Sequence, residues 1–307
     1  MIYTVTLNPF LDRIIEVEEL VYDDVNRITE ERSRAGGKGI DVSRVIKDLG
    51  GESVALGFAG GYSGMELEGR LIQEGVVCDL TPISGSTGLN VTVFQKRKKI
   101  QTLLSTASPE VGPLETLALL KKMRELPRGS YLVISGSAPG GIDDKFYAQM
   151  ITALGDRGIK VVIDADENIL RQAINARPYM IKPNIHELSR LVGKNLTEAE
   201  EVVESAKPFL DSAACVVISM GPRGAIGLSG NGIFHMIPPK VKVRSSVGAG
   251  DSLAAGLIFA LSKGDTFEDA LRLGVACGTA STLNLYVDGC SSAEVEAIEK
   301  DIIVKKF

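Results

Sequence analysis

The sequence predicts an α/β protein with a doubly wound parallel sheet, helices on both faces of that sheet, and a small separate β-layer. Short, continuously apolar runs alternate with longer segments of helical period, which is the rhythm of βαβ units. The runs predicted as strands buried on both faces are Val54–Ala59, Tyr131–Ser135, Lys160–Asp164 and Cys215–Met220. The segments predicted as helices between them are Lys38–Leu49, Gly64–Glu74, Pro113–Leu126, Asp143–Arg157 and Thr197–Leu210.

The two ends of the chain differ from this pattern. The N-terminal run MIYTVTLNPF is a short β-like segment that meets a polar turn. It has neither the basic start nor the long apolar stretch of a signal peptide. In the C-terminal third, three segments of helical period follow one another, and these are Gly250–Lys263, Thr266–Leu283 and Ser292–Ile303.

A small β-layer is predicted from four segments that do not fit a parallel βαβ sheet. Ile14–Val17 and Asn26–Arg34 are short and strand-like, and Asn90–Gln95 and Ile100–Leu104 flank a basic turn as in a β-hairpin. We expect this layer to span about residues 12–34 and 88–106 of a single domain formed by residues 1–307. Such a layer could cover a cleft as a lid.

Composition narrows the possible partners. The net charge of −5 over 307 residues disfavours a nucleic-acid binder, which would carry a basic stripe. No window approaches the roughly 18 uninterrupted apolar residues of a membrane-spanning helix. The four cysteines are scattered, without a CxxC pair or zinc-like spacing, and this favours a reduced, cytoplasmic protein. We therefore expect small-molecule ligands, and neither a nucleic acid nor a membrane.

The stretch SSVGAGDS, which precedes the helical segment LAAGLIFAL, predicts an anion site. Gly248, Ala249 and Gly250 let the backbone turn tightly at a helix start, where N–H groups and the helix dipole favour an anion. Asp251 follows in the first turn, where a carboxylate can accept the proton of an attacking hydroxyl. The alternative is that Asp251 only favours the helix dipole.

The stretch KPNIHEL predicts a second helix start with a possible metal role. Asn184 and Glu187 are three residues apart and share a helix face. An amide oxygen and a carboxylate suit Mg²⁺ held together with substrate phosphates. The alternative is a helix cap made by Asn184, with Glu187 as its capping-box partner.

Three further segments are candidate ligand contacts. In RAGGKGIDVSR, glycines precede a helix and let backbone approach a ligand, although Lys38 is followed by Gly39 and the segment is therefore no Walker A loop. Asp12 lies at the end of the first strand and its turn, where a carboxylate can bind ligand hydroxyls. The stretch SMGPRGA follows a buried strand. For RAGGKGIDVSR the alternative is a flexible turn with a solvated lysine. For Asp12 it is an aspartate in a turn, and for SMGPRGA it is a hairpin turn.

Taken together, and over essentially the whole chain, these features resemble the PfkB carbohydrate kinases of the ribokinase superfamily. The most specific stretches are AGGKGIDVSRVIKDLG (35–50) and VGAGDS (247–252), supported by KPNIHE (182–187). Within the family, the branch of 1-phosphofructokinase, tagatose-6-phosphate kinase and minor 6-phosphofructokinase is most similar. The stretches that indicate this branch are TLNPFLD (6–12), GGKG (36–39), ISGSAPGG (134–141) and GVACGTASTLN (274–284).

The resemblance implies a ribokinase-like fold and a role for each candidate. Asp251 is the expected catalytic base, and Gly248, Ala249 and Gly250 form the expected anion hole. Asn184 and Glu187 are expected to organise Mg²⁺. The nucleotide site is expected to contain Asn184 and to be lined by Lys182, Ser219, Gly221, Gly224, Ser245, Val247 and Asn284. The sugar side is expected to comprise Asp12, Gly36, Gly37, Lys38, Asp41, Asn90 and Ser137. The lid sheet is expected to form a homodimer surface.

Two positions depart from the pattern of that branch. The branch usually reads GGKGINV, whereas here position 41 is Asp41, a carboxylate that can only accept hydrogen bonds. The branch usually has Thr-Arg-x-Asn at the lid hairpin, where the arginine grips the substrate phosphate, whereas here Gly88 replaces the arginine. Both changes weaken the attraction for an anionic sugar.

The expected activity is ATP-dependent phosphoryl transfer to a hydroxyl of a sugar phosphate. The departures keep open a kinase for a non-phosphorylated sugar, an amino sugar or a polyol. A nucleoside or cofactor kinase of the same superfamily is a further alternative. An alternative from another functional class is a non-catalytic sensor that binds a sugar or a nucleotide. The sequence has no GxGxxG, GxSxG or HExxH motif, so dinucleotide oxidoreductases, serine hydrolases and HExxH metalloproteases lack their usual signatures.

Overall fold

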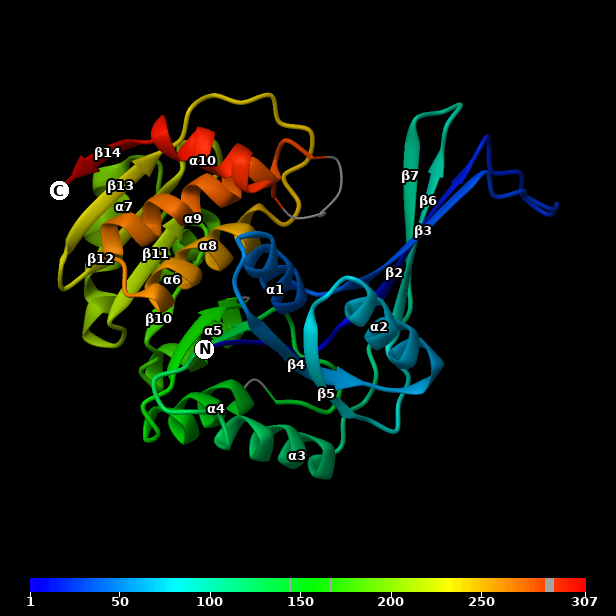
Figure 1. Ribbon diagram of the computed structural model, residues 1–307, viewed down its shortest axis with the longest axis horizontal. Helices are drawn as coiled ribbons and strands as arrows, with labels where there is room; N and C mark the ends of the chain where they lie inside the picture. The colour runs from blue at the N-terminus through cyan, green and yellow to red at the C-terminus, as the bar shows by residue number, and fades with distance from the viewer. Residues whose placement is uncertain (144, 166, 285–289) are drawn as a thin grey trace.

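One large sheet and one small sheet organise the chain in the computed structural model, which describes residues 1–143, 145–165, 167–284 and 290–307 (Figure 1). The large sheet has ten strands in the order β14-β13-β12-β11-β10-β9-β8-β1-β4-β5. Its parallel strands are β1 (Ile2–Thr6), β4 (Ser53–Ala59), β5 (Val77–Pro82), β8 (Tyr131–Ser135), β9 (Lys160–Asp164), β10 (Met180–Ile181) and β11 (Cys215–Ser219). Its antiparallel edge consists of β12 (Ala225–Ser229), β13 (Gly232–Ile237) and β14 (Ile303–Lys306).

The parallel strands are buried on both faces, as their continuous apolar sequences predict. In β8, Leu132 and Ile134 join one hydrophobic core, whereas Val133 joins another. Successive side chains of a strand point to opposite faces, so the two cores lie on the two sides of the sheet.

Helices cover both faces of the large sheet. One core is closed by α3 (Pro113–Arg124), α4 (Lys145–Gly155), α5 (Glu167–Asn175), α6 (Ile185–Val192) and α7 (Ala199–Ala206). The opposite face is covered by α1 (Lys38–Asp48), α2 (Gly61–Gln73), α8 (Ala249–Lys263), α9 (Phe267–Ser281) and α10 (Ser292–Lys300). Among the described residues, no helix is both long and apolar enough to cross a membrane.

Two predicted helices end three or more residues before their expected last residue. The helix predicted over Thr197–Leu210 ends at Ala206 and continues as a 3₁₀ turn, η1 (Lys207–Asp211), because Pro208 lacks the N–H that an α-helix needs. The helix predicted over Ser292–Ile303 ends at Lys300. The residues after it form β14, where they pair with β13.

The small sheet has the strand order β3-β2-β6-β7 and projects to one side of the large sheet (Figure 1). Its strands are β2 (Phe10–Val17), β3 (Glu30–Gly36), β6 (Gly88–Gln95) and β7 (Ile100–Ser105). The predicted hairpin is therefore confirmed as β6–β7. The expected limits of the lid stay a prediction. Strand β2 begins at Phe10, before residue 12, and β3 ends at Gly36, after residue 34.

The order of strands in the large sheet changes direction between β1 and β8. From β1 the chain adds β4 and β5 on one side, and it then adds β8, β9, β10 and β11 on the other. In open α/β sheets, ligands bind at such a point, beyond the carboxyl ends of the strands. Thr6, Ser135 and Asp164 end three adjacent strands there in matched register.

Candidate active site

The N-terminus of α8 supplies a backbone anion site. Gly248 precedes the helix in the left-handed conformation, with φ of 79°, which glycine adopts without strain. Both the amide and the hydroxyl of Ser252 bond to the Gly248 carbonyl at 2.9 Å, and these bonds hold the turn. The first N–H groups of a helix have no intrahelical acceptor, so this end of α8 can bind an anion.

Asp251 lies in the first turn of α8 and is buried. Burial raises its pKa well above the ordinary value, and repulsion from Asp164 and Asp41 adds to that effect. Attraction to Lys182 and Lys38 lowers the pKa and offsets part of the rise. Asp251 therefore lies among charges that come from two separate parts of the chain.

Lys182 and Asp164 form a buried ion pair on one side of Asp251. The lysine Nζ lies 2.9 Å from an oxygen of Asp164, and both side chains are almost fully buried. A Cβ added to Gly250 would lie 3.5 Å from the same Nζ. The ammonium group is therefore adjacent to the backbone that begins α8, where it reinforces the positive end of the helix.

The start of α1 contributes the other charges near Asp251. Gly37 precedes this helix with φ of 142°, and a Cβ there would lie 2.5 Å from Cγ2 of Thr6. The Thr6 hydroxyl accepts a hydrogen bond from the Ile40 amide at 3.1 Å. The end of β1 therefore fixes the start of α1, and with it Lys38 and Asp41.

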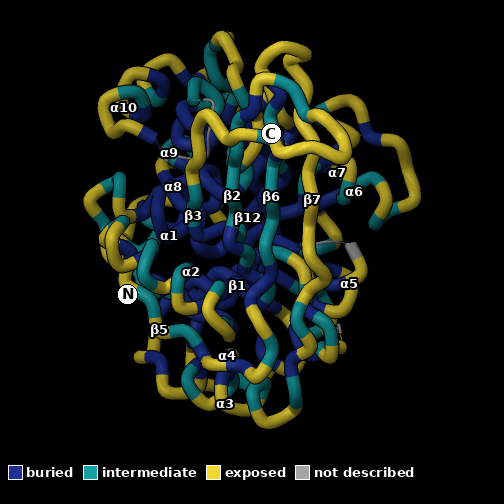
Figure 2. Tube along the Cα trace, turned by 90° about the vertical axis from the view of Figure 1, so that its right-hand side faces the viewer, coloured by how far each residue is buried: buried dark blue, intermediate teal, exposed yellow. Residues whose placement is uncertain are grey.

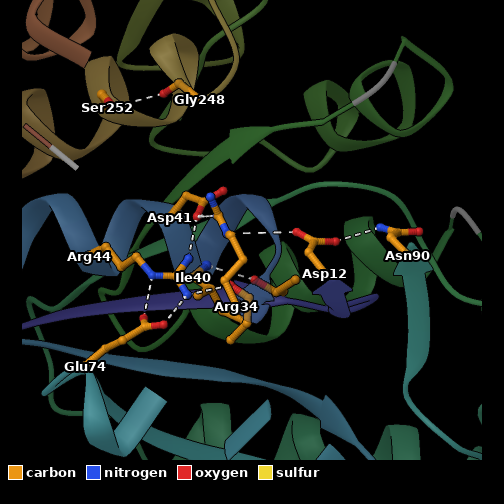
Figure 3. Close-up of polar contacts among 11 residues, drawn as sticks. Asp12, Arg34, Ile40, Asp41, Arg44, Glu74, Asn90, Gly248 and Ser252 are labelled. Carbon is orange, nitrogen blue, oxygen red and sulfur yellow. Dashed lines mark hydrogen bonds and ion pairs between the residues drawn. The ribbon is translucent and has the colours of Figure 1, made fainter. Parts of the chain in front are cut away.

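Asp41 is held between two guanidinium groups. One of its oxygens contacts Nη2 of Arg34 and also lies 2.6 Å from Nη1 of Arg44. Arg44 extends the network to Glu74, whose oxygen lies 2.6 Å from Nε (Figure 3). Burial nevertheless raises the pKa of Asp41, and the two arginines oppose that rise.

Asp12 and Asn90 come together on the small sheet. The Asn90 amide donates to Asp12 Oδ1 at 2.8 Å (Figure 3). A Cβ added to Gly36 would lie 2.3 Å from Asp12 Oδ2. The glycine is therefore required for the close approach of β3 to this carboxylate.

Asn184 and Glu187 form a complete capping box at the start of α6. Asn184 Oδ1 accepts from the amides of His186 and Glu187 at 2.9 Å, and Glu187 Oε2 accepts from the Asn184 amide at 2.7 Å. The capping alternative is thus correct. Among the described residues, no cluster of three or more His, Cys, Asp or Glu side chains could hold a metal. The metal role of this pair stays a prediction.

The remaining nucleotide candidates lie in two turns. Ser219 ends β11, and η2 (Gly221–Arg223) joins it to β12 as an antiparallel hairpin. In the second turn the Ser245 amide lies 3.4 Å from the Thr282 carbonyl, which brings Ser245 close to the segment that contains Asn284. Val247 is exposed just before α8.

The structure brings Lys38, Asp41 and Lys182 near Asp251. Ser137 is not among these residues. It is exposed in the loop after β8, and among the described residues no hydrogen bond joins its side chain to another candidate. Sequence reasoning missed Thr6, Arg34 and Asp164. Thr6 and Asp164 end buried strands, and that position is the signal that could have found them.

Comparisons with known proteins identify relatives of this chain. A family model described as pfkB family carbohydrate kinase matches residues 5–293. The 1-phosphofructokinase of Borreliella burgdorferi is 36% identical over 92% of this chain and 92% of its own length. The D-tagatose-1-phosphate kinase of Bacillus licheniformis is 32% identical over 98% and 99%. The tetrameric inhibited form of phosphofructokinase-2 from Escherichia coli superposes with a TM-score of 0.89 and 32% identity, covering 97% and 98%.

Replacement of Asp251 by asparagine should stabilise the fold at neutral pH. Because the pKa of Asp251 is raised, the folded state holds this proton more tightly than the unfolded chain does. Ionisation therefore destabilises the folded protein as pH rises above the ordinary aspartate pKa of about 3.9. The gain in Tm of Asp251→Asn over the parent should grow with pH and vanish in acid.

Thermal unfolding across a pH series measures this gain. Asp265→Asn is the matched control, because Asp265 is exposed just beyond the end of α8 and should give no pH-dependent difference. A loss of Tm for Asp251→Asn at neutral pH would contradict the assigned environment.

Proposed function

Because the chain belongs to the PfkB family of carbohydrate kinases, we propose that it transfers the γ-phosphoryl group of ATP to a hydroxyl of a fructose or tagatose phosphate. One observation carries the proposal. The buried Asp251 lies at the amide-rich start of α8, between the Asp164–Lys182 pair and the Asp41–Lys38 end of α1. A base, an anion site and two cations therefore converge on one point.

Asp251 acts as the general base. Its raised pKa makes it a stronger proton acceptor than an ordinary aspartate. As the acceptor hydroxyl attacks the γ-phosphorus, its proton moves to the carboxylate. A new O–P bond forms while the bond between the γ-phosphorus and the β-phosphate oxygen breaks, and ADP leaves.

The backbone of Gly248, Ala249 and Gly250 receives the negative charge that develops on the transferring group. Fixed N–H dipoles stabilise such charge without reorganising. Lys182 supports them from beside Gly250, and its ion pair with Asp164 keeps the ammonium in place.

The nucleotide binds along the turns that end β10 and β11 and precede α8. Lys182, Asn184 and Ser219 are neighbours there, since Asn184 and Ser219 form an isolated parallel bridge. Gly224 permits the tight turn after β11, because a Cβ there would lie 1.9 Å from the Met236 carbonyl oxygen. The other proposed contacts are Gly221, Ser245, Val247 and Asn284.

Mg²⁺ fits the Asn184–Glu187 corner as an ion held mainly by water and phosphate oxygens. The capping bond uses Glu187 Oε2 and leaves Oε1 outside the capping box. A single carboxylate is consistent with Mg²⁺, which keeps several waters and binds nucleotide phosphates. When bound, the ion neutralises phosphate charge and orients the phosphates.

The acceptor sugar binds between the small sheet and the start of α1. Asp12 and Asn90 are placed to bind its hydroxyls, and Gly36 and Gly37 let the backbone come close. Lys38 and Asp41 line the side nearest Asp251. Ser137 is the remaining proposed contact, although its exposed position offers it the least support.

A second copy of the chain is proposed to pack on the small sheet. Strand β7 is exposed along its whole length, including Leu103 and Leu104 (Figure 2). An exposed, apolar edge strand readily pairs with another chain unless it is covered. A homodimer through this sheet would bury that strand.

A coupled assay of ADP release over a panel of sugars tests the proposed activity. Fructose 1-phosphate, fructose 6-phosphate or tagatose 6-phosphate should exceed neutral sugars, amino sugars and polyols in kcat/KM. Asp251→Asn should lower kcat by about 10²–10⁴-fold, since a general base contributes that much. Asp265→Asn should match the parent. Activity of Asp251→Asn within about tenfold of the parent would exclude the proposed base.

Glu187→Gln should raise the Mg²⁺ concentration needed for half-maximal activity by about tenfold or more, by analogy with altered metal-site residues. The amide oxygen can still cap α6, so Tm should change little. Glu201→Gln is a matched control, because Glu201 makes the same capping box in α7. An unchanged Mg²⁺ requirement in Glu187→Gln would argue against the metal role.

Leu103→Asp should shift the protein from dimer to monomer in light scattering coupled to size exclusion. A charge cannot be buried in an apolar interface without a partner. Leu117→Asp, an equally exposed position on α3, should leave the mass unchanged. A monomeric parent, or a Leu103→Asp variant that stays dimeric, would refute the interface.

A further inference from the structure

A row of polar side chains crosses the small sheet and ends at α1. The strand register sets Arg34 of β3, Asp12 of β2, Asn90 of β6 and Ser105 of β7 opposite one another. Directly opposed residues project from the same face of a sheet. The hydroxyl of Ser105 donates to Asn90 Oδ1 at 2.6 Å, and Asn90 in turn donates to Asp12. All four side chains therefore belong to one face.

Arg34 lies at the end of this row nearest the catalytic centre. Its Nη2 contacts Asp41, and its Nε lies 3.9 Å from Asp12 Oδ2 (Figure 3). Asp41 is close enough to Asp251 to raise its pKa. The guanidinium of Arg34 is therefore within the acceptor side of the site, and its side chain keeps 19% of its surface exposed.

Strand β6 has no cation at position 88, where the related branch usually has an arginine. Residue 88, which opens β6, is glycine, and a Cβ there would lie 2.4 Å from the ring of Phe10. Phe10 therefore fills the space that a side chain at position 88 would need. At the far end of the same sheet, Lys96 and Lys98 are engaged by Glu16 and Glu19.

Resting on the proposed function, we propose that Arg34 binds the phosphate group that the acceptor sugar already carries. Asp41 is the positioning residue that holds the guanidinium in place. A planar guanidinium matches the geometry of phosphate oxygens, and one held in advance loses little conformational freedom on binding.

Arg34 belongs to a network of charged side chains. Asp41 contacts both Arg34 and Arg44, and Arg44 is also held by Glu74. Asp12 is engaged by the Asn90 amide, and its separation of 3.9 Å from Arg34 is long for an ion pair. Lys38 adds a second positive charge beside Asp251. Arg34 and Lys38 are the cations that the substrate phosphate would meet on this side of the site.

Arg34→Gln tests the assignment. We would measure KM for fructose 1-phosphate, fructose 6-phosphate or tagatose 6-phosphate, whichever the parent prefers, and Ki for the unphosphorylated sugar as a competitor. Loss of a charge-assisted contact should raise the sugar-phosphate KM about ten- to hundredfold. The Ki of the unphosphorylated sugar and the KM of ATP should stay within about threefold of the parent.

Arg32→Gln is the matched control. Arg32 lies two residues earlier on β3 and projects from the same face, but its partner is the exposed Glu30. This variant should keep both constants near those of the parent. If Arg32→Gln raises the sugar-phosphate KM as much as Arg34→Gln does, the effect is general to the sheet and the assignment fails.

Two further variants separate recognition from folding. Arg34→Gln leaves Asp41 with one guanidinium, whereas the double variant Arg34→Gln/Asp41→Asn leaves no carboxylate there. The double variant should lose phosphate recognition as the single one does. Asp41→Asn alone keeps the cation but removes the charge that holds it, so it should raise the sugar-phosphate KM by less than Arg34→Gln does.

The outcomes distinguish this inference from the function on which it rests. A parent that prefers sugar phosphates, together with an Arg34→Gln variant of unchanged KM, would overturn the inference alone. An equal loss of the phosphorylated and unphosphorylated sugars in that variant would also overturn it. A parent that prefers neutral or amino sugars would overturn the proposed function, and the inference with it.

Discussion

The site depends on a buried carboxylate whose charge is balanced from two directions. Asp251 has lost most of its contact with water, and two other carboxylates oppose its ionisation. Lys182 and Lys38 make an ionised form attainable. Because one lysine follows β10 and the other begins α1, this balance exists only when both halves of the large sheet are assembled.

Much of this arrangement could be read from the sequence. The apolar runs predicted the central strands closely, since a strand buried on both faces leaves a continuous signal. The glycines before α1 and α8 predicted helix starts near a ligand. The edge strands β12, β13 and β14 were harder to predict, because their identity depends on hairpin and register contacts with distant segments.

The electrostatic partners could not be predicted from local pattern. Asp164 and Lys182 are separated in sequence and meet because β9 and β10 are adjacent. The sequence alone shows that Asp41 departs from the usual pattern of the related branch. Its link through Arg34 to the row of polar side chains on the small sheet follows from the register of β2 with β3. Asn184 and Glu187 differ from these residues, because a motif that predicts a metal site in the sequence also caps α6 in the structure.

The interior position of β1 in the large sheet affects how the protein folds. Ile2 pairs with Ser53 on one side and with Tyr131 on the other, so β1 gains its two neighbours only from segments that lie much later in the chain. Until β8 emerges, β1 has an unpaired edge of the kind that recruits foreign strands. Because both partners of β1 are far along the chain, its pairing depends on contacts of long sequence separation, which slow folding.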